Sequence, residues 1–437
     1  MKEKPKGKLQ SVLLWYSDTM EKQKKGFYDF VQKMYITFMA FITNDLATIT
    51  SAGAYNFLLS AVPIFILVLI ILLQVLHANP KTILAFLQRS QIISIPLGIS
   101  DLVAYIGNVK NFAFFESALI VFIFWMSRRF FASIQHSIRM IYKKQIKIEP
   151  FKVSIIVIIG EIALVIFIVF SIIILTAGNA VFKTELPKRI FSPSNILVVK
   201  NAIRYAPIFF LLIFLFTIYY FMPPVRPTKK NAFFCAATCS LSFLVLKISL
   251  NFLHDRAKFD FVYGFFSNFI LLLAQVWFFF FFFVFFAQFM YVTQYFNSFI
   301  TSYLYCLPKH NDPKFLNQII RSLFIEPPQE YKHNMAFFKK DTTVFSAGEA
   351  TTDIYYIISG TVSIIGEKGA VELQKGDTFG EFACMVEGKR LTTAKALTDV
   401  LTVRIPEEDF LSALSIDGNV SRQALQALSE FVLKEKN

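Results

Sequence analysis

Long apolar stretches recur along the first 300 residues of the chain. They run approximately over residues 52–76, 112–132, 153–177, 203–222, 232–253 and 264–292. Each approaches or exceeds about 20 apolar residues, the length that a helix needs to cross the hydrocarbon core of a bilayer. Lipid offers no partner to an exposed backbone, so these stretches must be helices rather than strands. The pattern predicts an all-α polytopic membrane bundle of about six transmembrane helices over residues 51–292.

The segment before the first stretch, residues 1–50, carries a different pattern. Apolar residues recur at spacings of three and four, at Phe27, Phe30, Val31, Met34, Tyr35, Phe38 and Ile42. This periodicity is typical of an amphipathic helix that lies on the membrane interface. The long apolar run begins only near Ser51, too late for a cleaved signal peptide. We expect a cytoplasmic N-terminal segment with an interfacial helix over residues 27–42.

The pattern changes again after the last apolar stretch. Residues 293–333 contain four prolines and a short helical pattern, and we interpret them as a connector. From residue 334 to 437 the period becomes strand-like, in TVFSAG, IYYIISGTVSII and VLTVRI, with turns that contain glycine. Helical spacing returns over 421–436, with Ser421 as the expected N-cap. The sequence therefore predicts a separate small domain that combines strands with flanking helices.

Composition and charge agree with a bilayer as the solvent. Hydrophobic residues make up 55% of the chain and charged residues 17%, and the mean hydropathy is +0.53. Nucleic-acid binding is a poor explanation of the +14 net charge, because inner-membrane proteins concentrate Lys and Arg in their cytoplasmic loops. The loop charges favour a cytoplasmic N-terminus, and an even number of spans returns the C-terminus to the same side. We expect lipid as the partner and no nucleic acid.

Candidate chemistry for catalysis is sparse. The four cysteines, at positions 235, 239, 306 and 384, lack the spacing of a metal site. The five histidines are widely separated, whereas metal-dependent phosphodiester cleavage needs several carboxylates or histidines around one or two cations. The sequence predicts no metal, no catalytic residue, no cofactor and no enzymatic activity.

Four motifs in the apolar region occur in a recognisable order. They are SAGAYNFLLSAVP from Ser51, FWMSRRFFASIQHSIRMIY from Phe124, YYFMPP from Tyr219, and FVYGFFSNFILLLAQVWFFFFFFVFFAQF from Phe261. Together they resemble the YihY/BrkB family of bacterial inner-membrane proteins, formerly labelled ribonuclease BN. The resemblance covers residues 25–295 and implies a six-helix, multi-pass fold in the bacterial inner membrane. A transport role is commonly supposed for the family, and the nuclease label is regarded as mistaken.

Glu161 is the deepest acidic residue of the apolar stretches. Acidic groups are costly within a membrane and usually face a cavity or a partner helix. Two interpretations stay open at this point: contact with a permeant solute or proton, or an ion pair or hydrogen bond inside the bundle.

The C-terminal segment carries a second resemblance. Phe345, Gly348 and Glu349 in the first strand and turn, then GDTFGEFACMVEGKR over 376–390, resemble a cyclic nucleotide-binding domain, a β-roll flanked by helices. The family implies that Arg390 pairs with the cyclic phosphate of cAMP or cGMP, that Glu381 accepts from the ribose 2'-hydroxyl, and that Gly380 allows close backbone approach. The short helix after Gly380 would direct free N–H groups at the phosphate. The helix from Ser421 would be a lid over the base.

The sequence departs from this family beside the arginine. Lys389 replaces the usual proline and Leu391 the usual small residue, and the bulk of Leu391 would crowd the phosphate. Thr392 and Thr393 offer hydroxyls near the phosphate or base. A structural alternative stays open for Glu381, because a carboxylate also caps a short helix. A β-roll can also persist as a docking or oligomerisation module, so a homo-oligomer stays open as well.

Two functions remain in view. The first is a transport-related membrane protein regulated by a cyclic nucleotide that binds the C-terminal domain and acts through the connector. The second is a non-transporting membrane scaffold or envelope protein whose β-roll docks a partner.

Overall fold

The computed structural model describes most of the chain. The described residues are 22–81, 83–84, 103–104, 106, 114–142, 150–181, 208–256, 261–308, 313–326, 331, 334–366, 369–386, 388–416 and 418–436. They divide into two compact units, and we describe each by itself. Residues 40–291 form the bundle unit, and residues 1–39 together with 292–437 form the β-roll unit. The domain limits expected from the sequence, 1–50, 51–292, 293–333 and 334–437, remain predictions.

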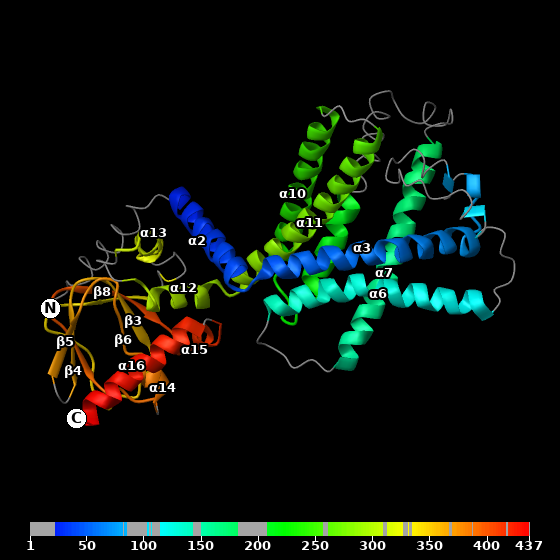
Figure 1. The fold of residues 1–437 in the computed structure, drawn as a ribbon. Helices are drawn as coiled ribbons and strands as arrows, with labels where there is room; N and C mark the ends of the chain where they lie inside the picture. Colours follow the sequence, from blue (N-terminus) through cyan, green and yellow to red (C-terminus); the bar gives the residue numbers. More distant parts are fainter. Residues whose placement is uncertain are drawn as a thin grey trace, which may run out of the picture. The chain divides into compact units, whose positions relative to one another are not determined.

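The bundle unit consists of apolar helices (Figure 1). Their bounds are α3 Leu46–Ile70, continued by the π-helical turn η1 Ile71–Val75, then α6 Phe114–Ile141, α7 Pro150–Val181, the helix Ile208–Phe221, α10 Lys229–Arg256 and α11 Phe261–Gln294. A helix covers most of each of the six predicted stretches, which confirms a mostly helical region with several apolar helices.

Not every helix of the bundle has the length and apolarity of a span. Within the described residues, Leu46–Val75, Lys229–Leu250 and Ile270–Gln294 are long and apolar enough to cross a membrane. Val157–Ile173 and Ile208–Phe221 are shorter apolar helices. The number of six spans and the cytoplasmic placement of both termini remain predictions.

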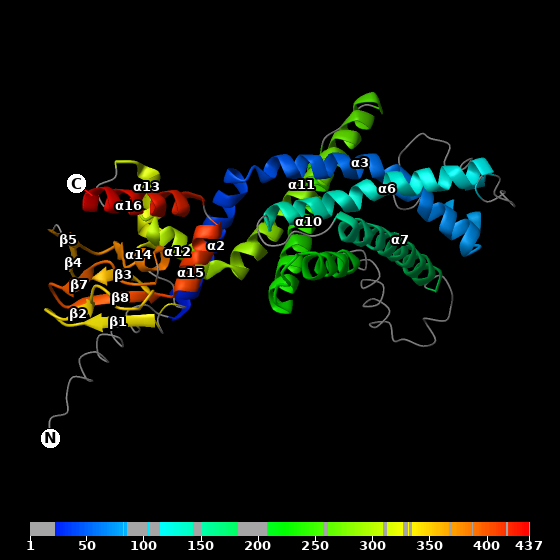
Figure 2. The same cartoon turned by 90° about the horizontal axis from the view of Figure 1, so that it is seen from below.

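Small residues let the bundle helices approach one another closely. Helices α3 and α6 run side by side in both views (Figures 1 and 2), and the rings of Phe57 and Phe130 meet edge to face with centroids 5.1 Å apart. A Cβ atom on Gly53 of α3 would lie 2.6 Å from the Phe280 ring of α11. Glycine at this position therefore sets how closely α3 and α11 pack.

The helix predicted before the first span is confirmed as α2, Lys22–Thr43, and most of it belongs to the β-roll unit. One face of α2 packs on the helices of the expected connector, α12 Phe296–Tyr305 and α13 Phe315–Phe324. Tyr28 donates to the Ser322 carbonyl at 2.7 Å, and Gln32 donates to the Leu323 carbonyl at 2.8 Å. Its placement on the membrane interface remains a prediction.

The C-terminal strands form two antiparallel four-stranded sheets, ordered β1-β8-β3-β6 and β2-β7-β4-β5. The strand bounds are β1 Met335–Phe338, β2 Thr343–Phe345, β3 Ile354–Ser359, β4 Val362–Gly366, β5 Gly369–Leu373, β6 Thr378–Phe379, β7 Thr393–Ala396 and β8 Val400–Ile405. Their inward side chains form a core that includes Phe345, Ile357, Val362, Phe379, Ala394, Ala396 and Val400. The expected β-roll is confirmed.

Three helices accompany the sheets: α14 Phe382–Met385, α15 Glu407–Ile416 and α16 Gly418–Lys436. The prediction that Ser421 is the N-cap of the last helix is wrong, because α16 already begins at Gly418. The Ser421 hydroxyl donates instead to the Leu414 carbonyl at 2.6 Å. It thereby satisfies a carbonyl in the last turn of α15, which has no partner within its own helix.

Replacement of Gly53 by Val should destabilise the bundle by about 1–3 kcal/mol, the usual range for overpacking of a tight contact. The exposed neighbour Ala52 is the matched control, and Ala52→Val should have little effect. Thermal unfolding of the full chain in detergent measures both. Addition of Phe280→Leu to Gly53→Val should restore part of the loss, and equal destabilisation by the two valine variants would contradict the close contact.

Candidate functional site

The side chain of Arg390 is buried within the β-roll unit, with 3% of its surface exposed. Its guanidinium group donates to Thr351 Oγ1 at 2.9 Å, to the Gly380 carbonyl at 2.8 Å and to the Asp353 carbonyl at 2.7 Å. The same group lies 4.0 Å from the centroid of the Phe345 ring, within the range of a cation–π contact. A buried charge is tolerated only when it is bonded in this way.

The backbone of Arg390 is also held in place. Its N–H donates to the Glu349 carbonyl at 3.0 Å, and its carbonyl accepts from Gly348 at 2.8 Å. The turn at 348–349, one of the motifs that carried the resemblance, therefore fixes the arginine. Gly380 has a φ of +91°, and a Cβ there would lie 2.6 Å from Arg390 Nη1. Only glycine fits both the backbone angle and the approach of the guanidinium.

Glu381 precedes α14, and its side chain makes no capping hydrogen bond to that helix. The structure therefore does not support the alternative that this carboxylate is a helix cap. Burial raises the pKa of the Glu381 carboxyl to about 7, although its own backbone N–H and the nearby Arg390 act in the opposite direction. The phenol of Tyr305, at the end of α12, is close enough to interact with this carboxyl, and burial also raises the pKa of Tyr305.

The other residues discussed for the nucleotide site, Leu391, Thr392 and Thr393, differ in how free they are to contact a ligand. The Thr393 hydroxyl accepts a hydrogen bond from the Ala347 N–H at 3.1 Å, so it serves the fold of the first turn. Thr392 is partly buried. Leu391 keeps 37% of its surface exposed. The structure thus brings Gly380, Glu381 and Arg390 together, while one of the two threonine hydroxyls is already engaged.

Sequence reasoning missed several residues of the site. Thr351 and Asp353 bind Arg390 from the loop before β3, and the Asp353 carboxylate also pairs with Arg404 at 2.6 Å. The polar run TTD before a strand was the only signal for them. Tyr305 had no signal, because it lies 76 residues before Glu381 in the sequence.

The second candidate site lies in the bundle unit. Glu161 of α7 is 2% exposed. Its Oε1 atom shares a hydrogen bond with the hydroxyl of Ser127 on α6, and its Oε2 atom has no hydrogen-bond partner among the described residues. A structural hydrogen bond inside the bundle is therefore present, and it leaves half of the carboxyl group unsatisfied.

Apolar helices joined to a β-roll with a buried arginine define a class: membrane proteins with a C-terminal cyclic nucleotide-binding domain. The family described as "Cyclic nucleotide-binding domain" matches residues 335–417, and the family described as "Virulence factor BrkB" matches residues 37–299. Because the latter match covers more than half of the chain, the chain belongs to the BrkB family of membrane proteins. Both resemblances inferred from the sequence are thereby confirmed, and neither family is typically enzymatic.

Solved structures match the C-terminal region. The Thermus thermophilus catabolite activator protein is 24% identical, with coverage of 23% of this chain and 50% of that one and a TM-score of 0.20. The sensor domain of the transcriptional regulator DNR from Pseudomonas aeruginosa is 23% identical, with coverage of 23% and 72% and a TM-score of 0.21. A PKAR CBD2 structure with bound Sp-2Cl-cAMPS is 16% identical, with coverage of 31% and 87% and a TM-score of 0.23. A search of curated proteins returned no match to this chain.

The raised pKa of Glu381 predicts a pH-dependent stability of the β-roll. The folded state holds the proton more tightly than the unfolded chain, whose carboxyl has the ordinary pKa of 4.5. The β-roll should therefore gain stability as the pH falls from above 7 toward 4.5, by up to about 3 kcal/mol. Calorimetric unfolding of the full chain at several pH values measures this gain. Glu381→Gln should flatten the profile, and an unchanged profile in that variant would contradict the assignment.

Proposed function

We propose that this BrkB family protein moves a solute across the inner membrane and that a cyclic nucleotide bound in its C-terminal domain regulates it. The observation that carries the nucleotide site is Arg390. Among the described residues, three of its five N–H groups have an acceptor, and we assign the other two to the oxygens of a phosphate. A cAMP or cGMP ligand would place its phosphate at this guanidinium and its ribose hydroxyl at Glu381.

The residues next to Arg390 are of the types that a cyclic nucleotide would need. The glycine at 380 leaves no side chain between the guanidinium and the cassette backbone. The Glu381 carboxyl carries no capping bond, which supports a role as the acceptor of a ribose hydroxyl. Because the side chain of Arg390 is 3% exposed, a phosphate would reach its two remaining N–H groups only if the surrounding contacts opened, so the loop that carries Thr351 and Asp353 would shift on binding.

The route from this site to the bundle begins at α12. Tyr305 lies close to Glu381, stacks edge to face on Phe410 of α15 with centroids 5.2 Å apart, and accepts a bond from Gln423 of α16 at its carbonyl. Only Tyr295 separates α12 from α11 of the bundle. A change at Glu381 would therefore reach α11 through a single short helix.

A second connection from the β-roll unit to the bundle runs through α2. The rings of Tyr303 and Phe324 stack with centroids 4.2 Å apart, and Tyr35 of α2 packs on both rings. Gln32 is fully buried in the same interface. The chain then passes from α2 into α3 through Asn44 and Asp45. The start and the end of the bundle are thus both attached to helices of the β-roll unit.

One observation favours the scaffold function instead. Arg390 donates to three protein groups and is 3% exposed, so little of its surface is open to a ligand. A β-roll of this kind would dock a partner or a second copy of the chain, and no nucleotide would alter it.

Thermal stabilisation of the full chain by cAMP and cGMP separates the two functions. At a concentration of 100 times its Kd, a ligand should add about 2.7 kcal/mol to the stability of the β-roll. Arg390→Lys keeps the charge but loses the fork geometry, and we expect it to reduce this gain sharply. Arg404→Ala, which removes a largely exposed arginine that also contacts Asp353, is the matched control. No stabilisation of the wild type by either nucleotide would favour the scaffold.

The α2 route makes a distinct prediction for hydrogen exchange in the full chain. A nucleotide that binds should change the exchange of both residues 296–305 and residues 22–39. Gln32→Leu fills the same space but loses the bond to the Leu323 carbonyl. The variant should keep the response of 296–305 and lose most of the response of 22–39. An unchanged response of 22–39 would contradict transmission through α2.

A further inference from the structure

The carboxyl group of Glu161 lies where α6 and α7 approach each other closely. The preceding residue is glycine, and a Cβ on Gly160 would overlap the ring of Phe131 on α6. The two helices therefore pack with almost no space between them at this level, and Glu161 keeps only 2% of its surface exposed. Water has little access to the carboxyl while this packing holds.

The hydrogen bonds at this site can be counted. Ser127 Oγ is 2.9 Å from the Phe124 carbonyl of its own helix and also bonded to Glu161 Oε1. A serine hydroxyl has one hydrogen, so it can donate to only one of these oxygens at a time. When it donates to the Phe124 carbonyl, the bond between Ser127 and Glu161 needs a hydrogen from the carboxyl itself.

The second carboxyl oxygen of Glu161 also favours the protonated form. Oε2 is buried without a hydrogen-bond partner among the described residues. An ionised carboxylate would then have at most one hydrogen bond for two charged oxygens, and a buried charge in that state is neutralised by uptake of a proton. In a protonated carboxyl, Oε2 is a neutral carbonyl oxygen, whose burial costs far less.

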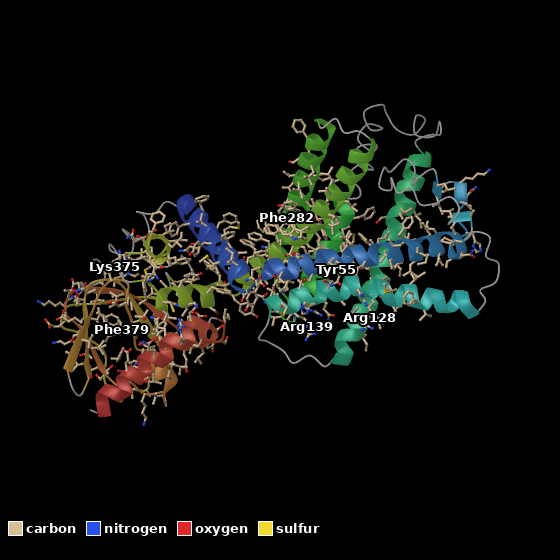
Figure 3. All side chains as sticks on the ribbon, in the orientation of Figure 1. Tyr55, Arg128, Arg139, Phe282, Lys375 and Phe379 are labelled. Carbon is tan, nitrogen blue, oxygen red and sulfur yellow. The ribbon has the colours of Figure 1, made fainter. Side chains whose placement is uncertain are left out.

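One nearby cation, Arg128, favours the ionised form of the Glu161 carboxyl. Arg128, next to Ser127 on α6 (Figure 3), interacts electrostatically with the Glu161 carboxyl. Helix α3 carries no acidic, basic or histidine residue, and neither does Ile208–Phe221. Arg128 is thus the cation positioned to stabilise Glu161 once the proton leaves.

We propose that Glu161 is a proton-binding site of the bundle: its carboxyl holds a proton that it donates to Ser127 Oγ, and it releases this proton as the pH rises. The proton passes to water, and the carboxylate left behind is stabilised by Arg128. No oxidant or other reactant takes part. The proposal goes beyond nucleotide regulation, because it assigns the proton as a ligand of the bundle itself.

Labelling with dicyclohexylcarbodiimide, which reacts with protonated carboxyls in apolar surroundings, tests the site in full-length protein in phospholipid vesicles. At neutral pH we expect mass spectrometry to find the label on Glu161, and we expect the label to decrease as the pH rises. Glu161→Gln should abolish it. The exposed Glu372 is the control, because a carboxylate in water should remain unlabelled under the same conditions.

Infrared difference spectra provide a second readout that does not depend on reagent access. The difference between the wild-type and Glu161→Gln spectra at neutral pH should contain the C=O stretch of one protonated carboxylic acid, and Ser127→Ala, which removes the acceptor, should shift that band. Arg128→Gln should leave the label on Glu161 undiminished. If the label and the C=O band appear only in Arg128→Gln, Glu161 is ionised and paired with Arg128, and the proposal is wrong. These readouts measure neither transport nor nucleotide binding, so they can fail while the proposed function stands.

Discussion

The cost of burying an ionisable group governs both units of this protein. A charge removed from water is stable only if hydrogen bonds and counter-charges replace its hydration, and otherwise the group changes its protonation state. Arg390 represents the first outcome, since Thr351, Gly380 and Asp353 all accept its hydrogen bonds. Glu161 represents the second, since one of its oxygens has no partner among the described residues. The two side chains belong to different units, but the cost of burying an ionisable group explains the bonding of one and the protonation of the other.

The requirement of Arg390 for partners also explains the architecture of the β-roll around it. Three segments converge on this residue: the turn at 348–349 bonds its backbone, and the loop before β3 and the cassette that begins at Gly380 bond its guanidinium. The positive φ of Gly380 and the close approach of Nη1 make this convergence sterically feasible. A ligand phosphate would bond the same guanidinium that these segments bond. Its binding would therefore rearrange the contacts that fix them. The fold and the proposed regulation therefore depend on one side chain.

Much of this architecture could be predicted from the sequence, for physical reasons. Apolar runs such as 264–292 predict helices because lipid permits little else, and the spacing from Gly380 to Arg390 located the cassette. Local patterns failed where the deciding contact was distant. Ser421 had the residue type of an N-cap, yet its hydroxyl bonds to Leu414 of the preceding helix. The bonds from Tyr28 to Ser322 and from Gln32 to Leu323 join residues 294 and 291 positions apart, and no local pattern specifies such pairs.

The attachment of α2 to α13 bears on how the proposed regulation would reach the bundle. With α12 alone, a nucleotide could act only on the helix that ends the bundle, α11. With α2 docked in the same unit, the β-roll unit also holds the chain that leads into α3, whose Gly53 packs on Phe280 of α11. The two proposed routes therefore lead to helices that touch at Gly53 and Phe280, where there is little room for displacement. A ligand shifts an equilibrium only as far as it binds the two states differently. If protonation of Glu161 and nucleotide binding both favour one arrangement of these helices, linkage requires each to strengthen the other by the same factor.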